Sequence, residues 1–403
     1  MIAVIEVILL SYLAGCILYN LVLSIAGRLQ RKENTPAPEA AAHARVAILI
    51  PAYKEDDIIL STVKSYDRLN YPGHLYQVVV IADSLQPETI DQLRHTGATV
   101  IPVSFEKSTK AKSLNAAFMQ LPEDAYDLAV ICDADNMLAP DFLQKVNSAF
   151  QGGEHVIQTQ RVAKNMNTPF AVLDAANEII GNHLYRKGAN ALGLSSSIIG
   201  SGMAFQYPLI KSIMQEIEAT GGFDKVLQLL LVSRGYAIYY LESALVFDEK
   251  VEHPEAFKNQ RRRWLSSQLV YLRAYWKKGW QYLFRGNVDY FNLAVCQNLL
   301  MPRSLLVASV TVITVLYILL HHYLLLPATW WVALWVCNCI SLLLPIPGMF
   351  YRRYLLSALL GLPHALFIMV SLLFRLKGAN NRFIHTKHTQ TGIDNPLLDV
   401  VSK

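Results

Sequence analysis

The stretch from Ser304 to Tyr351 contains no Lys, Arg, Asp or Glu, and it constrains the fold of this chain more than any other feature. It is long enough for two helices to cross a bilayer, joined by a loop near Pro327. Basic residues collect on the cytoplasmic side of membranes, so Arg352 and Arg353 predict that the chain returns to that side. We therefore expect residues 301–376 to form the membrane part of the chain.

A second apolar segment lies at the N-terminus. Residues Ile2 to Gly27 are apolar apart from Glu6 and Asn20, and Arg28 follows. A cleaved signal peptide is the alternative, but the basic region that would precede its apolar core is missing and the apolar run is too long. The pattern favours a transmembrane helix over residues 1–28, with its C-terminal end in the cytoplasm.

A third apolar run, Tyr354 to Phe374, is interrupted by Gly361-Leu362-Pro363 and followed by basic residues from Arg375 onward. A full crossing here would place this basic tail outside the cell, against the positive-inside bias. We therefore predict a re-entrant or interfacial hairpin, followed by a cytoplasmic tail over residues 377–403.

The middle of the chain has a different pattern. After a linker at residues 29–45, short apolar runs alternate with helical patterns through residues 46–250, which predicts an α/β domain with a mostly parallel, doubly wound sheet. The predicted strands are Val46–Ile50, Gln77–Ala82, Thr99–Val103, Leu128–Asp133 and His155–Gln160, and the predicted helices are Glu55–Leu69, Pro87–His95, Ser108–Gln120, Asp141–Phe150 and Phe223–Ser233.

Residues 251–300 join this domain to the membrane part. Within them, Phe257 to Leu283 combines seven Lys and Arg residues with Trp264, Trp276 and Trp280. This composition predicts a helix along the membrane surface, with its tryptophans at headgroup depth. An ordinary amphipathic surface helix is the alternative.

Composition excludes other functions. Hydrophobic residues make up 53% of the 403 residues and charged residues 17%, and the net charge of +5 lies mostly beside the membrane segments, which favours a lipid surface over nucleic acid as a partner. The five cysteines form neither a zinc pattern nor a disulfide framework.

The pair Asp133 and Asp135 follows a buried apolar run. Alternation along a strand would point both carboxylates the same way, at the edge of the sheet where α/β proteins bind ligands. Two carboxylates there suit a divalent cation that carries a phosphorylated substrate. Taken alone, the pair is more typical of a solvated turn.

Other strand ends carry polar residues too. Glu55 and Asp83 follow the first two strands, and Lys110 opens the helix before the Asp pair. Each alone could cap a helix or face solvent. Together they are expected to converge on one crevice.

The ordered motifs resemble those of membrane-embedded family 2 glycosyltransferases, akin to cellulose, chitin, hyaluronan and bacterial exopolysaccharide synthases. The resemblance covers residues 46–268 and rests on Pro51-Ala52-Tyr53-Lys54-Glu55, Val79-Val80-Ile81-Ala82-Asp83, Asp133-Ala134-Asp135, Gly200-Ser201-Gly202-Met203-Ala204-Phe205 and Gln260-Arg261-Arg262-Arg263-Trp264. It implies an A-type glycosyltransferase fold.

The resemblance also implies residue roles. Those implied for the nucleotide, expected to be uridine diphosphate, are Ala52, Glu55, Asp83, Lys110, Asp133 and Arg263. Asp133 and Asp135 would hold Mg²⁺ or Mn²⁺, and the acceptor sugar would meet Gly202, Met203, Gln260 and Trp264. The forked Arg263 side chain suits a diphosphate, and Trp264 offers a stacking face.

The chain departs from the family at the catalytic base. Where the family has Glu-Asp, this chain has Phe223-Asp224. Inverting transfer needs one carboxylate to accept the proton of the attacking hydroxyl, so Asp224 alone suffices, and the alternative is a helix N-cap. The segment Phe383–His388 resembles a lid over the nucleotide; a solvated basic tail is its alternative.

We therefore expect an inverting transferase at the cytoplasmic face of a bacterial inner membrane that adds sugar from a UDP-sugar to a growing polysaccharide. Few crossings are predicted for a channel, so a secretion partner or homo-oligomer is a candidate to complete the export path. The alternatives are transfer of one sugar to a lipid acceptor and a non-catalytic scaffold that senses nucleotide sugar.

Overall fold

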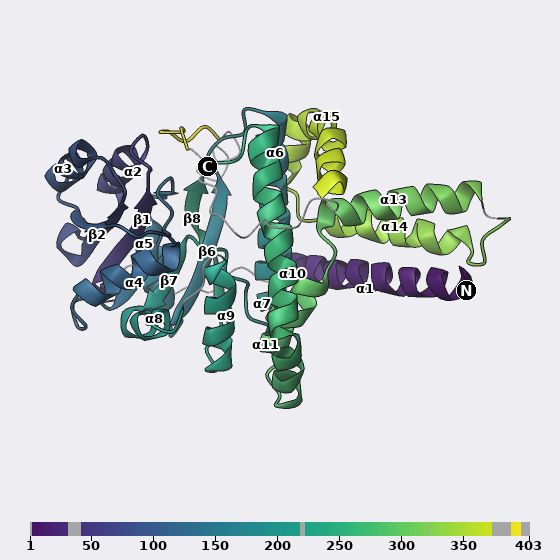
Figure 1. Ribbon diagram of the computed structural model, residues 1–403, viewed down its shortest axis with the longest axis horizontal. Coiled ribbons are helices and arrows are strands. Elements are labelled where there is room, and N and C mark those ends of the chain that lie inside the picture. Colours follow the sequence, from purple (N-terminus) through teal and green to yellow (C-terminus); the bar gives the residue numbers. More distant parts are fainter. Residues whose placement is uncertain (1, 31–41, 218–221, 321, 373–387, 396–403) are drawn as a thin grey trace.

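The computed structural model describes residues 2–30, 42–217, 222–320, 322–372 and 388–395. Figure 1 shows an α/β domain at one end and a bundle of roughly parallel helices projecting from the other. Two long helices, α6 (Pro169–Asn182) and α10 (Pro254–Phe284), lie between these parts and run across the direction of the projecting helices. The molecule therefore consists of the α/β domain, the two crossing helices α6 and α10, which we call the platform, and a helix bundle.

One eight-stranded sheet, in the order β3-β2-β1-β4-β7-β6-β8-β5, forms the α/β domain. The first four strands in this order are parallel, β7 runs antiparallel to β4 and β6, and β8 is parallel to β6. The strands are β1 (Val46–Tyr53), β2 (Tyr76–Asp83), β3 (Thr99–Val103), β4 (Leu128–Ile131), β5 (Met137–Leu138), β6 (Val156–Ala163), β7 (Met203–Gln206) and β8 (Tyr239–Asp248).

Helices cover both faces of this sheet, as a doubly wound fold requires. They are α2 (Ile59–Ser65), α3 (Pro87–His95), α4 (Lys110–Gln120), α5 (Phe142–Gln151), α8 (Tyr207–Met214) and α9 (Phe223–Ser233). The central strand residues, such as Ile48 and Leu49 of β1, are fully buried and alternate between two hydrophobic cores on opposite faces. The predicted fold class is therefore confirmed.

Most predicted elements agree with the structure within a few residues, and two differ near the site. The strand predicted to reach Asp133 ends at Ile131, and a turn follows in which Asn136 N–H donates to the Asp133 carbonyl. The helix predicted from Glu55 begins at Ile59, because the Glu55 carbonyl already accepts from Ile58 and Ile59 in a preceding turn.

A buried ionic network joins the sheet to the platform. Glu178 of α6 accepts two hydrogen bonds from the Arg161 guanidinium of β6, at 2.7 and 3.1 Å, and lies 3.4 Å from the Lys250 ammonium. Asp174, one turn earlier on α6, pairs with Arg261 of α10. These contacts fix α6 and α10 relative to the sheet that carries the site.

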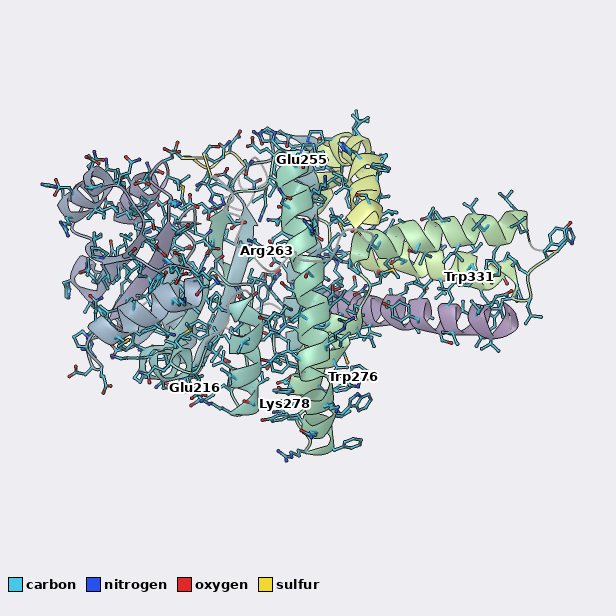
Figure 2. The ribbon with its side chains drawn as sticks, in the orientation of Figure 1. Glu216, Glu255, Arg263, Trp276, Lys278 and Trp331 are labelled. Carbon is cyan, nitrogen blue, oxygen red and sulfur yellow. The ribbon has the colours of Figure 1, made fainter. Side chains whose placement is uncertain are left out.

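The projecting bundle consists of α1 (Ile2–Leu29), α13 (Arg303–Leu319) and α14 (Ala328–Leu343). Its interior is filled with side chains: Leu13, Ile17, Val310 and the fully buried Trp331, labelled in Figure 2, form one cluster. Near the far end, the Glu6 carboxylate accepts from the backbone N–H groups of residues 325 and 326 in the α13–α14 loop.

By length and composition, two helices could cross a bilayer: Val4–Leu29 and Gly348–Leu372. A third candidate is the bent pair Val288–Leu299 and Arg303–Leu319, whose halves meet at 51°; within it lie α11 (Val288–Phe291), the π-helix η5 (Asn292–Cys296) and α12 (Gln297–Leu299). The predicted second crossing of the charge-free stretch, α14, is shorter, at 16 residues.

The predicted interruption of the last apolar run is wrong. Helix α15 (Gly348–Leu372) is continuous through Pro363, so this segment forms no hairpin. Gly361 lies against Pro169 and Leu173 of α6, which explains why a small residue occurs at this position. Helix α15 also contacts α10 and α13 instead of running alongside α1.

Candidate active site

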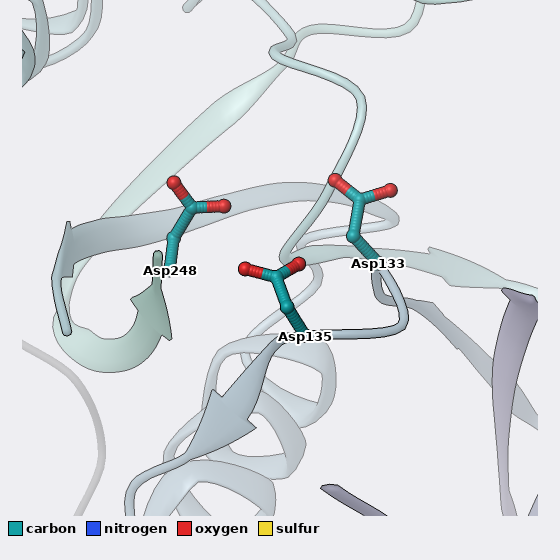
Figure 3. A group of neighbouring side chains, drawn as sticks. All are labelled: Asp133, Asp135 and Asp248. Atoms are coloured by element: carbon teal, nitrogen blue, oxygen red, sulfur yellow. The ribbon is translucent and has the colours of Figure 1, made fainter. Parts of the chain in front are cut away.

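Three carboxylates meet beyond the carboxyl end of β4. Asp133 and Asp135 lie on the turn after this strand, and Asp248 ends β8 (Figure 3). One oxygen from each lies within 4.8 Å of the others. The side chains of Asp135 and Asp248 are largely buried, whereas that of Asp133 is 39% exposed, so the cluster opens to solvent on the Asp133 side.

Neighbouring groups hold the two buried carboxylates in place. Asp135 accepts from the Glu249 backbone N–H at 2.9 Å, and Asp248 accepts from the Lys250 ammonium at 2.7 Å. Burial raises the pKa of Asp135 to about 6, with Asp248 and Asp133 adding to the rise. Burial would also raise the pKa of Asp248, but Arg161 and Lys250 hold it below its ordinary value.

These residues fit a divalent cation. Three converging carboxylates supply hard oxygen ligands, which Mg²⁺ and Mn²⁺ prefer, and the mutual repulsion that raises the pKa of Asp135 is relieved when a cation lies between them. The predicted pair Asp133 and Asp135 is therefore brought together, and Asp248 joins it.

The carboxyl ends of β1 and β2 lie next to that of β4, because β1 pairs in parallel with both β2 and β4. Ala52 and Asp83 are buried there, and Glu55 follows β1. The Ser84 hydroxyl donates to one Asp83 oxygen at 3.0 Å, while the other Asp83 oxygen is buried without a hydrogen-bond partner. A buried acceptor without a hydrogen-bond partner is uncommon, and it fits a position where a ligand would donate a hydrogen bond.

The backbone at this edge is unusual. Lys54 and Ser84, which directly follow Tyr53 of β1 and Asp83 of β2, both have positive φ, at 55° and 58°. This conformation disfavours non-glycine residues, and such strain concentrates at functional sites. The Lys54 N–H donates to the Asp83 carbonyl at 3.1 Å, so the two strand ends are tied together.

Lys110, the first residue of α4, contacts both the carboxylate cluster and the loop at Gly200. Its ammonium pairs with Asp133 and donates to the Gly200 carbonyl at 2.7 Å. It also lies 5.7 Å from the centroid of the Phe223 ring. The side chain of Phe223, which replaces the acidic residue of the family motif, therefore lies near the ammonium of Lys110.

The predicted acceptor segment is residues 200–205, and its first part is anchored on β6. Gln158 donates to the carbonyls of Ser201 and Gly202 and accepts from the Ile199 N–H. Gly202 has φ +59°, and a Cβ there would lie 2.8 Å from the Thr159 hydroxyl, so only glycine fits.

Met203, predicted to meet the acceptor, is wholly buried in the sheet core as the first residue of β7. Its side chain packs among the apolar residues of that core. We therefore assign it a packing role and remove it from the candidate acceptor residues.

Asp224 lies in the first turn of α9, and Lys110 with Gly200 links it to the carboxylate cluster. It adjoins the acceptor loop, because a Cβ built on Gly200 would lie 3.9 Å from the Asp224 Cβ. Burial raises the pKa of Asp224 above its ordinary value, although Lys225 and Lys110 oppose the rise. Arg263 is influenced by both Asp133 and Asp224. Burial lowers the pKa of Arg263, and the charges of these two carboxylates both act against that shift.

The remaining motif residues lie on α10. The Gln260 side-chain carbonyl is buried without a hydrogen-bond partner, and Trp264 is 40% exposed. The guanidinium of Arg261, which pairs with Asp174, is 4.3 Å from the Trp264 ring centroid. Arg261 therefore anchors the motif, and Gln260, Arg263 and Trp264 remain the candidate ligand contacts.

The C-terminal segment 388–395 lies over this site. His388 Nδ1 is 3.0 Å from a Glu55 oxygen, and the backbone N–H groups of Thr389 and Gln390 donate to Glu249. Burial would lower the pKa of His388, but Asp135 and Glu55 raise it to about 10, which keeps the imidazole charged. Of the predicted lid, residues 383–387 lie outside the described part of the chain.

Sequence reasoning missed Asp248, Lys164 and the pairing of His388 with Glu55. Lys164 is buried and donates to the Asp135 carbonyl at 3.0 Å. A signal for Asp248 was present, since it ends an apolar run just as Asp133 does. The pairing of His388 with Glu55 joins residues 333 positions apart, and no local pattern indicates it.

A glycosyltransferase of the A-type fold is the class of protein that this sheet and site define. The profile of the glycosyltransferase-like family 2 matches residues 43–267, more than half of the chain. The chain therefore belongs to this family.

Curated relatives include a probable glycosyltransferase, YdaM, of Bacillus subtilis, 24% identical over 246 residues, covering 57% of this chain and 56% of the relative. The beta-monoglucosyldiacylglycerol synthase of Synechocystis is 21% identical over 268 residues, covering 64% and 55%. The chain thus spans little more than half the length of these relatives.

Among solved structures, the mannosyltransferase PcManGT of Pyrobaculum calidifontis, in complex with GDP-mannose and Mn²⁺, is similar to this chain. Its TM-score is 0.56 at 16% identity, covering 93% of this chain and 99% of that one. This similarity confirms the A-type fold.

Proposed function

We propose that this protein is an inverting glycosyltransferase that moves a sugar from a UDP-sugar to an acceptor presented at the cytoplasmic face of the membrane. One observation carries the proposal. The carboxylates of Asp133, Asp135 and Asp248 meet in one cluster, and Lys110 links Asp133 to the Gly200 carbonyl, beside which Asp224 lies. The charges of Asp133 and Asp224 both act on Arg263. This arrangement separates a leaving-group site from a base, as a direct displacement requires.

In the proposed reaction, Asp224 accepts the proton of an acceptor hydroxyl while that oxygen bonds to the anomeric carbon and the bond to the diphosphate breaks. Lys110 and Arg263 neutralise charge on the departing diphosphate. A Mg²⁺ or Mn²⁺ ion held by Asp133, Asp135 and Asp248 would supply further neutralisation of the same charge.

The donor end of the crevice is proposed to hold the nucleoside. The unpartnered Asp83 oxygen suits an N–H or ribose hydroxyl donor, and Ala52 is proposed to contact the nucleoside. Trp264, Gln260 and the backbone of Gly202 are proposed to contact the acceptor.

Two acceptors are considered. The projecting bundle is filled by side chains such as Trp331, which favours transfer of one sugar to a lipid acceptor, and the name of the Synechocystis relative describes a glycolipid synthase. A growing polysaccharide, the acceptor favoured by the sequence, would need a secretion partner or a second copy of the chain to complete an export path. The size of the labelled product distinguishes these acceptors.

The test uses membranes containing the full chain, a panel of labelled UDP-sugars and Mn²⁺. We expect labelled lipid or polymer from the wild type, about 10²- to 10⁴-fold less from Asp224→Asn, and wild-type amounts from Asp91→Asn, a control at an exposed position on α3. Asp224→Asn should still bind UDP with Mn²⁺. If the wild type yields no labelled product and no hydrolysed donor, the non-catalytic scaffold becomes the better description.

The proposed location is a bacterial inner membrane, with the catalytic domain in the cytoplasm. The exposed aromatic face of α10 supports contact with the bilayer, because Trp276 lies on the side of α10 from which α1, α13 and α14 project (Figure 2). Protease cleavage of a C-terminal tag from the periplasmic side of intact spheroplasts would contradict this topology.

A further inference from the structure

The turn that begins α9 is held by a side chain from α10. Gly222 precedes α9 with φ 65° and ψ 40°, a left-handed conformation. Its carbonyl accepts two hydrogen bonds, from the Lys225 N–H at 3.0 Å and from the Tyr271 hydroxyl at 3.1 Å. The first of these closes the first turn of α9, and the second ties that turn to α10.

The ring of Tyr271 also packs against this turn. A Cβ built on Gly222 would lie 3.0 Å from a Tyr271 ring carbon and 3.2 Å from its hydroxyl oxygen. The glycine therefore permits both the left-handed turn and the close approach of the ring. Substitution of either residue would move the start of α9, where Asp224 is the second residue of the helix.

Tyr271 is suited to hold the backbone of the turn in place by a hydrogen bond, and it is not suited to exchange protons. Burial, with the charge of Asp224 adding to it, raises the pKa of Tyr271 to about 12, so its hydroxyl remains a hydrogen-bond donor at neutral pH. Its ring stacks on that of Tyr275, with centroids 6.0 Å apart and planes 9° from parallel, which limits its rotation.

Helix α10 carries other parts of the site on the same side. Tyr271 follows Trp264 by seven residues, about two helical turns, so both side chains point toward the catalytic domain. One rigid helix therefore holds a candidate acceptor contact at Trp264 and the anchor for the turn before Asp224.

We propose that Tyr271 is a positioning residue that holds the turn at Gly222 so that Asp224 faces the acceptor hydroxyl beside Gly200. This inference rests on the proposed function, because it assigns Tyr271 a role through Asp224. The hydroxyl contributes no charge to the donor site, so its loss is expected to affect the chemical step more than donor binding.

The test compares Tyr271→Phe with Tyr275→Phe in the purified full chain, with UDP-sugar and Mn²⁺. Loss of one neutral hydrogen bond should lower kcat about 3- to 10-fold in Tyr271→Phe with the KM for donor unchanged. Tyr275→Phe, which keeps the stacked pair, should retain wild-type values. Equal kcat values for the two variants, or a change confined to the KM for donor, would overturn the inference.

A second comparison separates positioning from general stability. If Tyr271 acts through Asp224, Tyr271→Phe should cause little further loss of the residual rate in an Asp224→Asn background. An equal loss in both backgrounds would show an independent structural role. If Asp224→Asn itself keeps wild-type activity, the base assignment fails first, and the Tyr271 comparison in the wild-type background still reports whether this hydroxyl matters.

Discussion

The ammonium of Lys110 donates to the carbonyl of Gly200 at 2.7 Å while it pairs with Asp133. One side chain therefore contacts both the proposed cation site and the proposed acceptor loop. Because Gly200 also adjoins Asp224, a change at Lys110 reaches three parts of the site.

Replacement of Lys110 by Met should lower kcat/KM for the UDP-sugar about 10- to 100-fold, because charge-assisted hydrogen bonds contribute about 1.5–3 kcal/mol. Steady-state kinetics on the full chain measures this. Lys112→Met is the matched control, since the exposed Lys112 lies two residues further along α4, on the other side of the helix, and donates to the Lys107 carbonyl. Equal effects of both variants would remove Lys110 from the proposed site.

The pH dependence of kcat should show an acid limb set by Asp224. Burial raises the pKa of this carboxyl, and only its deprotonated form accepts the hydroxyl proton. Activity should therefore rise with pH through a value above about 3.8, the ordinary Asp pKa, and level off above it. On the plateau above this pKa, Asp224→Asn should lose about 10²- to 10⁴-fold in rate. If the Asp224→Asn variant had a pH-independent rate equal to that of the wild type, the base role of Asp224 would be contradicted.

Asp248 should contribute to the affinity for the cation. Asp248→Asn is expected to weaken Mn²⁺ binding at least about 10-fold, measured by calorimetry with UDP present. The substitution also leaves Lys250 and Arg161 with less neighbouring negative charge, so the thermal midpoint of the variant should be recorded beside its affinity. Asp133→Asn, at the most exposed carboxylate of the three, tests the same site with less disturbance of the buried network. Unchanged Mn²⁺ binding in both variants would exclude the cluster as the cation site.

Local signals predicted the part of the site that lies at strand ends. Asp83 and Asp133 follow apolar runs, and the carboxyl ends of parallel strands necessarily meet at one edge. Asp133 and Asp135 do lie together as predicted, but strand alternation is not the cause. The turn closed by Asn136 brings these two side chains together.

Long-range relationships could not be predicted in this way. The contacts of Tyr271 with Gly222 and of His388 with Glu55 depend on how α10 and the C-terminal segment pack, which no periodicity encodes. The burial of Met203 depends on the register of β7 against β4 and β6. The continuity of α15 through Pro363 shows packing on α6 overriding a local helix-breaking pattern.

The outward face of α10 should make activity depend on anionic lipid. Leu269, Arg273, Trp276, Trp280 and Phe284 recur at helical spacing and are all exposed, and the exposed Lys277 flanks this stripe. In nanodiscs, activity should rise with the fraction of anionic lipid and fall with salt, since each basic group near such a surface contributes about 1 kcal/mol.

The double variant Arg273→Glu and Lys277→Glu should abolish this dependence on lipid charge. Lys112→Glu, on the exposed side of α4, is the control for an equal type of charge change. Equal activity of the wild type in neutral and anionic nanodiscs would contradict a role of this face in binding charged headgroups.

Glu178 should be the most sensitive stability position of the platform. Three cations surround its carboxylate: Arg161 at 2.7 Å, Lys250 at 3.4 Å and Arg186 at 3.6 Å. Burial would raise the pKa of Glu178, but these cations lower it far below its ordinary value, so the group stays ionised at neutral pH. Its contribution to stability is therefore present above the ordinary Glu pKa and is lost as the pH falls toward the lowered value.

Glu178→Gln should destabilise the folded chain by about 3–5 kcal/mol, because removing one partner leaves buried cations uncompensated. Thermal unfolding in detergent measures the change, with Glu242→Gln as the control, since Glu242 pairs with Lys187 at a half-exposed site where loss of an ion pair costs about 0–1 kcal/mol. The difference between the two variants should narrow as the pH is lowered, because protonation removes the same charge from the wild type. Equal thermal midpoints at neutral pH would show that the network does not hold α6 to the sheet.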